Sequence, residues 1–467
     1  RRIAAVALMT LLLGVGCNGT PQPHHPTPQP TVPPTATATL TATAVAPAAH
    51  DRGPELQVND PVKLGLSVGG VKKLCDDNLA MAKKIIAAVR RVDPANPAEL
   101  TWDNTLGRID DAVLAINNGS EFPYLMGVAH PDETVRLAAR ECEKKTDELV
   151  TSLYLDAKLA KVLKAYQKRG DKLSEERARF LAHTLRDFRR NGLDLPPAKQ
   201  ARLTKINQEL TDLGQKFVAE IGATAGTVSL KPGQLRGLPA SYQASHKPND
   251  KGRVVISTDY PDYYPFVRHA LDRKAARDLY VKFVNRGGDA NVSRLDRILM
   301  LRHEKAKMLG YASWADYAIE PRMAKNASEV MAFLDRVKKA IAPSVAREKR
   351  AFALELQKVS GGAFTQMTPP DRYFLEDRLK KKNFQLDSIK LAEYFDVDLV
   401  TKGLLDITST MYGISYQPAT GDVWHPEVKG YDVISGGKKI AKFYLDLHPR
   451  PAKYKHAAMF TVRTAKT

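Results

Sequence analysis

The feature that most constrains the fold is a long run of helical periodicity in the middle of the chain. Apolar residues spaced three or four apart lie on one face of an α-helix, and they recur at Leu203, Ile206, Leu210, Leu213, Phe217 and Ile221. Further amphipathic helices are predicted at 74–89, 101–117, 132–170 and 175–191, the second of them ending at Asn118-Gly119. Strand signals are nearly absent here, so the sequence predicts a mainly α fold, a large helical bundle.

A small antiparallel sheet is predicted near the C-terminus. Residues 443–447 alternate between apolar and polar side chains, which is typical of a half-buried strand. On this strand, Asp446 is expected to bond a basic neighbour such as Arg450. Before this strand, Gly436-Gly437 allows the positive φ angles of a tight hairpin turn. Because the alternation returns after a proline break, we expect three short antiparallel strands, at 431–434, 439–447 and 456–462.

The block 442–462 reads K-F-Y-L-D-L-H-P-R-P-A-K-Y-K-H-A-A-M-F-T-V and resembles the small sheet of the thimet oligopeptidase family. Shorter segments resemble the same family in the same order, at 186–196, 237–239, 253–265, 301–317 and 323–325. The resemblance spans roughly 74–462. It implies a zinc metallopeptidase that cuts short peptides in a mostly helical channel, with an N-terminal helical domain at 61–255 and the first part of a catalytic domain at 256–467.

The family's zinc motif is not found in this sequence. The resemblance implies one zinc ion held by the two histidines of a His-Glu-x-x-His helix and a later glutamate, while the motif's glutamate activates water. The only His-Glu pair here is His303-Glu304, and Lys307 stands where the second histidine belongs, so we expect an ordinary pair on a helix surface. His425 and Glu427 are two apart across a proline, a spacing that does not converge on a metal. We expect no catalytic and no metal-ligating residue in 1–467, an incomplete gene model, and no activity from these residues alone.

A peptide-binding edge is expected at His456-Ala457-Ala458. In zincins the strand beside the cleft pairs with the backbone of an extended peptide, and the related angiotensin-converting enzymes carry a His-Ala-x-Ala run at the comparable strand. By this resemblance, small side chains would give access to the backbone, and His456 would donate a hydrogen bond to a substrate carbonyl. The alternative is structural: His456 packs under a loop and the alanines lie below a helix.

The N-terminus has the layout of an export signal. Arg1-Arg2 precedes the apolar run 3–15, which is too short to cross a membrane, and Gly14-Val15-Gly16-Cys17 resembles a bacterial lipobox. We expect a signal peptide at 1–17 and lipidation of Cys17, with plain secretion or a structural thiol as alternatives. Residues 18–60 are rich in Pro, Thr and Ala and are expected to be a disordered tether. The expected location is the bacterial cell envelope, lipid-anchored, periplasmic or secreted.

The two remaining cysteines, Cys75 and Cys142, allow two interpretations. They could pair in an oxidising compartment, or they could be two buried free thiols. The large core favours the second interpretation.

The formal net charge of +19 suggests an acidic partner when taken alone. However, Lys and Arg are interleaved with Glu and Asp along the predicted helices, and no nucleic-acid motif is visible. We expect short peptides and, through the lipid anchor, a membrane as partners of a monomer, and no nucleic acid. The alternative function is a non-catalytic helical lipoprotein that binds peptides or a protein partner.

Overall fold

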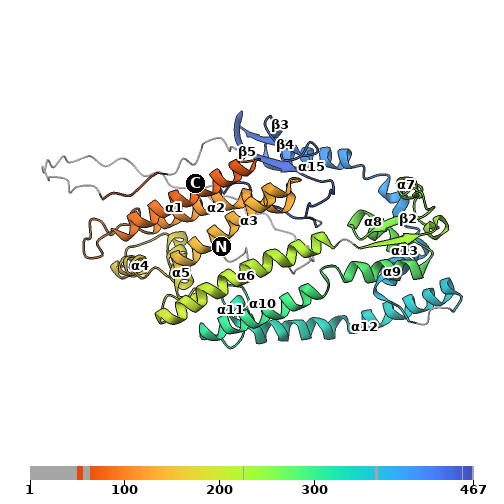
Figure 1. The fold of residues 1–467 in the computed structure, drawn as a ribbon, viewed down its shortest axis with the longest axis horizontal. Helices are drawn as coiled ribbons and strands as arrows, with labels where there is room; N and C mark the ends of the chain where they lie inside the picture. The colour runs from red at the N-terminus through yellow and green to blue at the C-terminus, as the bar shows by residue number, and fades with distance from the viewer. Residues whose placement is uncertain (1–49, 56–63, 225, 363–365, 455, 465–467) are drawn as a thin grey trace, which may run out of the picture. The chain divides into compact units, whose positions relative to one another are not determined.

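The computed structural model describes residues 50–55, 64–224, 226–362, 366–454 and 456–464 (Figure 1). Cys17 and most of the predicted tether lie outside these residues. From Arg52 onward the chain forms one compact unit. The boundary predicted at 255 stays a prediction. The unit is mainly α-helical, which confirms the predicted fold class. Within the described ranges, none of the helices combines the length and apolar content needed to cross a membrane.

The first half of the chain holds six long helices: α1 Val68–Arg90, α2 Leu106–Ala129, α3 Glu133–Tyr154, α4 Ala157–Arg169, α5 Glu175–Arg190 and α6 Pro197–Ala223. The second half opens with β1 Thr227–Leu230, η1 Pro232–Leu235, α7 Ala240–Ser245, β2 Val254–Ser257, α8 Tyr260–His269, α9 Arg273–Val284, α10 Gly288–Met308 and α11 Trp314–Ile319. It continues with α12 Ala327–Ser360, α13 Pro369–Phe384, α14 Ser388–Ala392, α15 Val397–Tyr412, β3 Ser415–Pro418, β4 Lys429–Ser435 and β5 Lys438–Leu445.

Helices α1, α2 and α3 run side by side and share one apolar core with α4 and α5 (Figure 1). The prediction that the second helix ends at Asn118-Gly119 is wrong, because α2 continues to Ala129. A β-carbon on Gly119 would lie 2.7 Å from Cβ of Asn78 on α1. The glycine therefore allows two helix backbones to approach closely, and this packing outweighs its tendency to end a helix.

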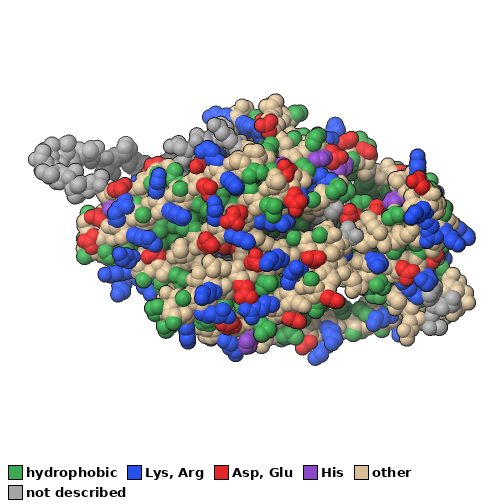
Figure 2. Space-filling model, in the orientation of Figure 1, with side chains coloured by type: hydrophobic (Ala, Val, Ile, Leu, Met, Phe, Trp, Pro, Cys, Tyr) green, Lys and Arg blue, Asp and Glu red, His purple; other side chains and the backbone are tan. Residues whose placement is uncertain are grey.

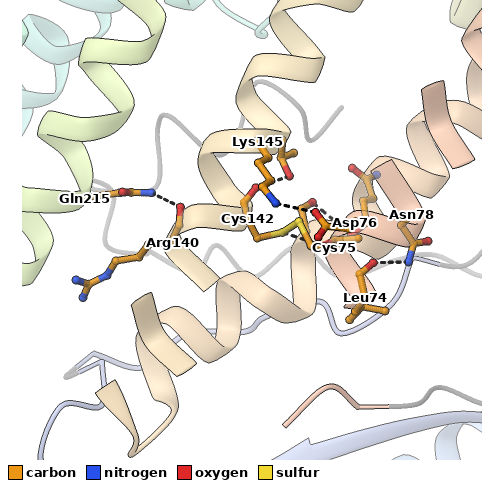
Figure 3. The surroundings of a disulfide bond; sticks show 12 residues. Leu74, Cys75, Asp76, Asn78, Arg140, Cys142, Lys145 and Gln215 are labelled. Atoms are coloured by element: carbon orange, nitrogen blue, oxygen red, sulfur yellow. Dashed lines mark hydrogen bonds and ion pairs between the residues drawn. A yellow bond between two sulfur atoms is a disulfide. The ribbon is translucent and has the colours of Figure 1, made fainter. Parts of the chain in front are cut away.

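A disulfide joins Cys75 of α1 to Cys142 of α3, with 5.9 Å between their Cα atoms (Figure 3). The preference for two free thiols is therefore wrong. Both cysteines are buried, as expected, but α1 and α3 are neighbours whose facing positions bring the two sulfur atoms together. Beside the bond, Lys145 of α3 donates to Asp76 of α1 over 2.8 Å. Sequence spacing alone could not show that these helices are adjacent.

The contact between α3 and α6 is polar. Thr211 donates to Asp147 over 2.5 Å, and the Gln215 amide donates to Glu143 over 2.7 Å. Burial raises the pKa of both carboxyl groups. Lys305 of α10 joins this group of polar contacts by donating to Asn207 of α6 over 2.7 Å. Burial lowers the pKa of Lys305 to about 8. Helices α3, α6 and α10 are therefore joined by hydrogen bonds between side chains. In contrast, α1–α5 pack through apolar side chains.

The predicted hairpin near the C-terminus is confirmed. Strands β4 and β5 pair antiparallel, and Gly436 and Gly437 form the turn with φ angles of 55° and 76°. The third strand, however, is β3, so the described sheet has the order β3-β4-β5. The prediction of a strand at 456–462 is wrong. This segment lies along α2, where Phe460 and Val462 pack on the same apolar cluster as Phe122. Its alternating pattern reflects packing against a helix.

Prediction: removal of the disulfide should lower the free energy of unfolding by about 4 kcal/mol. The two cysteines are 67 residues apart, and closing a loop of that length restricts the unfolded chain by this amount. Denaturant unfolding with and without a reductant measures the loss. The double variant Cys75→Ala, Cys142→Ala is the control, and its stability should not depend on the reductant. Equal stability of the oxidised and reduced wild-type protein would contradict the prediction.

Candidate functional site

The candidate site lies after β5, where Asp446 organises the chain. Arg450 donates to both of its carboxylate oxygens, over 2.7 and 2.9 Å, and Lys453 donates to Oδ1 over 2.8 Å. The indole of Trp424 donates to Oδ2 over 2.9 Å. The predicted bond between Asp446 and Arg450 is confirmed. Asp446 therefore has a structural role, as a carboxylate held by three donors, one from the loop before β4 and two from the loop after β5.

Burial opposes the charged form of Asp446, but the hydrogen bonds from Arg450, Lys453 and Trp424 outweigh it and lower its pKa to about 2. The chain turns tightly between the two basic residues, with Ala452 at φ 63°, a conformation that costs an alanine about 1 kcal/mol. Lys453 also donates to the His448 carbonyl over 2.7 Å. The turn is thus fixed from both ends.

The same network anchors the segment that follows to α2. Arg450 donates to the Ala129 carbonyl over 2.8 Å, and the backbone N–H of Tyr454 donates to the Val128 carbonyl over 2.7 Å. At the far end, Thr464 donates through its backbone to Asn118 over 3.0 Å and through its hydroxyl to Glu121 over 2.8 Å. Residues 456–464 are therefore held along the surface of α2 at both ends.

The predicted peptide-binding residues His456, Ala457 and Ala458 are all exposed. The arrangement in which they lie beneath a loop or helix is not the one found, and neither do they form a strand. The imidazole Nδ1 of His456 lies 3.1 Å from the carbonyl oxygen of Ala457. Their role in binding a peptide stays a prediction.

His456 lies at the edge of an aromatic cluster that the sequence interpretation did not identify. Its ring is 5.8 Å from the ring of Tyr260 on α8, in an edge-to-face arrangement. Tyr260 contacts Tyr264 at 5.0 Å and Phe283 of α9 at 6.0 Å, and Tyr264 contacts Tyr373 of α13 at 5.8 Å. The tyrosine-rich run 260–264 was the sequence signal for this cluster, because three aromatic residues so close together often pack against other rings. The exposed segment after β5 therefore faces aromatic side chains from a different part of the fold.

The two described combinations of His and Glu, at 303–304 and 425–427, do not form a metal site. His303 is exposed on α10, and Glu304 is held by Arg202, which donates to both carboxylate oxygens over 2.6 Å. The prediction of a helix-surface pair is confirmed. The ring of His425 accepts a hydrogen bond from the backbone of Glu427 over 3.3 Å, a local loop contact. Among the described residues, no group of three or more His, Cys, Asp or Glu side chains could hold a metal ion.

Comparison with known proteins gives a consistent result. Residues 266–467 match the family described as peptidase family M3. A probable thimet oligopeptidase from Arabidopsis thaliana is 24% identical over 410 residues, which cover 86% of this chain and 57% of the relative. A thimet-like oligopeptidase from Dictyostelium discoideum is 30% identical over 390 residues, which cover 77% of this chain and 56% of that relative. Oligopeptidase A from Salmonella typhimurium is 28% identical over 301 residues, which cover 60% of this chain and 44% of that relative. The chain spans about half the length of these relatives.

Prediction: Asp446→Asn should lower the free energy of unfolding at pH 7 by about 3–5 kcal/mol. The substitution leaves the buried cations of Arg450 and Lys453 without their counter-charge. Urea unfolding measures the loss. Asp398→Asn is the matched control, because its pair with Lys429 is well exposed and should contribute at most about 1 kcal/mol.

The pH dependence provides a second test. The pKa of Asp446 is lowered from 3.8 to about 2, so its charge stabilises the folded state above pH 4. This contribution is lost as the pH falls from about 4 to about 2. The difference between wild type and Asp446→Asn should therefore shrink in that window. A difference that stays constant down to pH 2 would contradict the assigned network.

Proposed function

We propose that this chain is a member of peptidase family M3, the family of the thimet oligopeptidases, and that the protein hydrolyses short peptides as a zinc metallopeptidase. The match over residues 266–467 is the observation that carries the proposal. A helical body with a small antiparallel sheet, as the family resemblance implies, supports it. In this proposal a deep helical channel limits the substrates to short peptides.

The residues described here do not fit a zinc ion, since they bring no ligand set together. The sequence 1–467 also contains no His-Glu-x-x-His motif. We therefore assign the zinc ligands and the general base to polypeptide outside these residues, and we derive no chemical step from this chain. Bound zinc would polarise the scissile carbonyl and activate water. The contribution of residues 1–467 is to bind and orient the peptide.

Residues 456–458 are the proposed contact with the substrate backbone. They are exposed, their side chains are small after His456, and the Tyr260 ring lies beside them. Aromatic rings beside an exposed backbone suit a peptide with apolar side chains. In the protein together with its zinc-bearing part, His456→Ala should weaken binding of a short peptide about tenfold, the loss expected for one hydrogen bond. His448→Ala, also exposed, is the control. Equal losses in both variants would contradict this role.

The cell envelope is the proposed location. The lipobox-like sequence before Cys17 and the Pro-rich segment after it support export with a lipid anchor. The disulfide between Cys75 and Cys142 is of a kind that persists in oxidising compartments. If Cys17 carries the lipid, Cys17→Ala should move the protein from the membrane fraction to the soluble fraction. A wild-type protein that is soluble after cell fractionation would exclude the anchor.

The first experiment is to read the DNA that follows the codon for Thr467. The proposal expects an open reading frame that continues into His-Glu-x-x-His and a later glutamate. The encoded protein should then hydrolyse a quenched fluorescent peptide and lose this activity with a chelator. An immediate stop codon would contradict the peptidase proposal for this gene product and favour the helical peptide-binding lipoprotein.

A further inference from the structure

Helix α12 is exposed on all sides over six turns. Residues 331–351 are all exposed, although they carry an apolar stripe. The stripe consists of Phe333, Leu334, Val337, Ile341 and Val345, whose side chains are 36–55% exposed. Among the described residues, the start of α12 contacts α11, and its end is covered where Leu356 packs with Phe374 and Leu375 of α13. The middle of α12 therefore has a helical pattern for burial and nothing described that buries it.

Helix α15 shows the same feature at another edge of the molecule. Val400, Leu404, Ile407 and Met411 are spaced three or four apart and are 48–67% exposed. The helix is tied to β3 through the hydroxyl of Tyr416, which donates to Thr408 over 2.9 Å. Figure 1 shows α15 and α12 on different edges, with α8, α9 and α13 between them in this view.

These two stripes need a partner. Amphipathic helices owe most of their stability to packing of the apolar face, and a large exposed apolar patch marks an interaction site. In contrast, helices α1–α5 of the first half share one buried apolar core. The exposed stripes are confined to the second half of the chain, within the part that matches peptidase family M3.

We propose that the stripes of α12 and α15 are the docking surface for a second body of polypeptide, the one that corresponds to the unaligned part of the relatives. The alignments reach only 57% and 56% of the Arabidopsis and Dictyostelium proteins, so more than two fifths of each lies outside them. A body of that size can cover two edges at once. A flat lipid surface meets only one edge, and a short peptide covers only one stripe. The inference rests on the proposed function, because this body would carry the zinc ligands.

The charges around the α12 stripe define what the partner surface carries. Arg336 and Lys338 directly flank Val337, and each lies about 100° around the helix axis from it, on opposite sides. Three turns further along, Arg347 and Lys349 lie on opposite sides of Glu348, which stands on the same face of the helix as the stripe. The partner surface should therefore have an apolar centre with acidic residues on both rims.

The test is co-expression of the full chain with the part of the Dictyostelium thimet-like oligopeptidase that lies outside its aligned region. The variant Val337→Asp, Ile341→Asp places two charges on the stripe. The control Ala342→Asp, Ala346→Asp places the same charges at the same spacing on the other side of α12, where both alanines are exposed. Leu404→Asp, Met411→Asp tests the α15 stripe. Helix content from circular dichroism confirms that each variant is folded.

The expected result is that the wild type and the control retain the co-expressed polypeptide on affinity purification. Both stripe variants should retain at least tenfold less. Hydrolysis of a short peptide and zinc content are read in the same samples. Stripe-dependent retention without zinc or hydrolysis would leave the docking surface standing and contradict the proposed function.

Three results would overturn the docking proposal. The first is no retention by the wild type, and the second is equal retention by wild type and stripe variants. The third is evidence that the stripe binds a second copy of this chain or a lipid surface in place of the co-expressed polypeptide. Sedimentation velocity would then show a dimer that the stripe variant loses, or vesicles containing phosphatidylglycerol would bind the wild type and not the stripe variant.

Discussion

The buried carboxylate of Asp446 is the interaction on which the rest of the C-terminal region depends. An ionised carboxylate is costly to remove from water unless donors surround it, and here Arg450, Lys453 and Trp424 supply them. Arg450 also donates from Nη2 to the Ala129 carbonyl of α2, 321 residues earlier in the chain. One charge therefore fixes the turn after β5, the position of the sheet and the path of residues 456–464. The candidate peptide-binding residues follow this anchor, and Thr464 holds the segment to α2 at its other end.

Local patterns were sufficient to predict much of the fold. The stripe from Leu203 to Ile221 predicted α6, and Gly436-Gly437 between two alternating runs predicted the β4-β5 hairpin. In both cases the signal comes from neighbours in the sequence. The alternation at 456–462 misled for the same reason, since Phe460 and Val462 show that one side of the segment is buried but not what buries it. A strand and an extended segment packed on a helix share the same period of two.

Features that depend on contacts between distant segments could not be predicted. Gly119 looked like a helix end until Asn78 of α1 was found against it. Cys75 and Cys142 pair because α1 and α3 are neighbours, and His456 faces Tyr260 although nearly two hundred residues separate them. For the candidate site, the sequence identified Asp446, Arg450 and the exposed residues 456–458, and missed Trp424 and the aromatic cluster. The high net charge was equally uninformative, because acidic and basic side chains are intermingled on the face shown in Figure 2.

The long reach of Arg450 to Ala129 has a consequence for the order in which the protein folds. The apolar cluster that contains Phe122 and Met126 of α2 is completed by Trp424 and Val428. A ribosome adds about 5–20 residues per second, so α2 exists for many seconds before its covering residues are made. Throughout this interval an apolar face of the N-terminal helices stays open to water and to other nascent chains. The aggregation hazard during synthesis is thus set by the distance along the chain between α2 and the sheet.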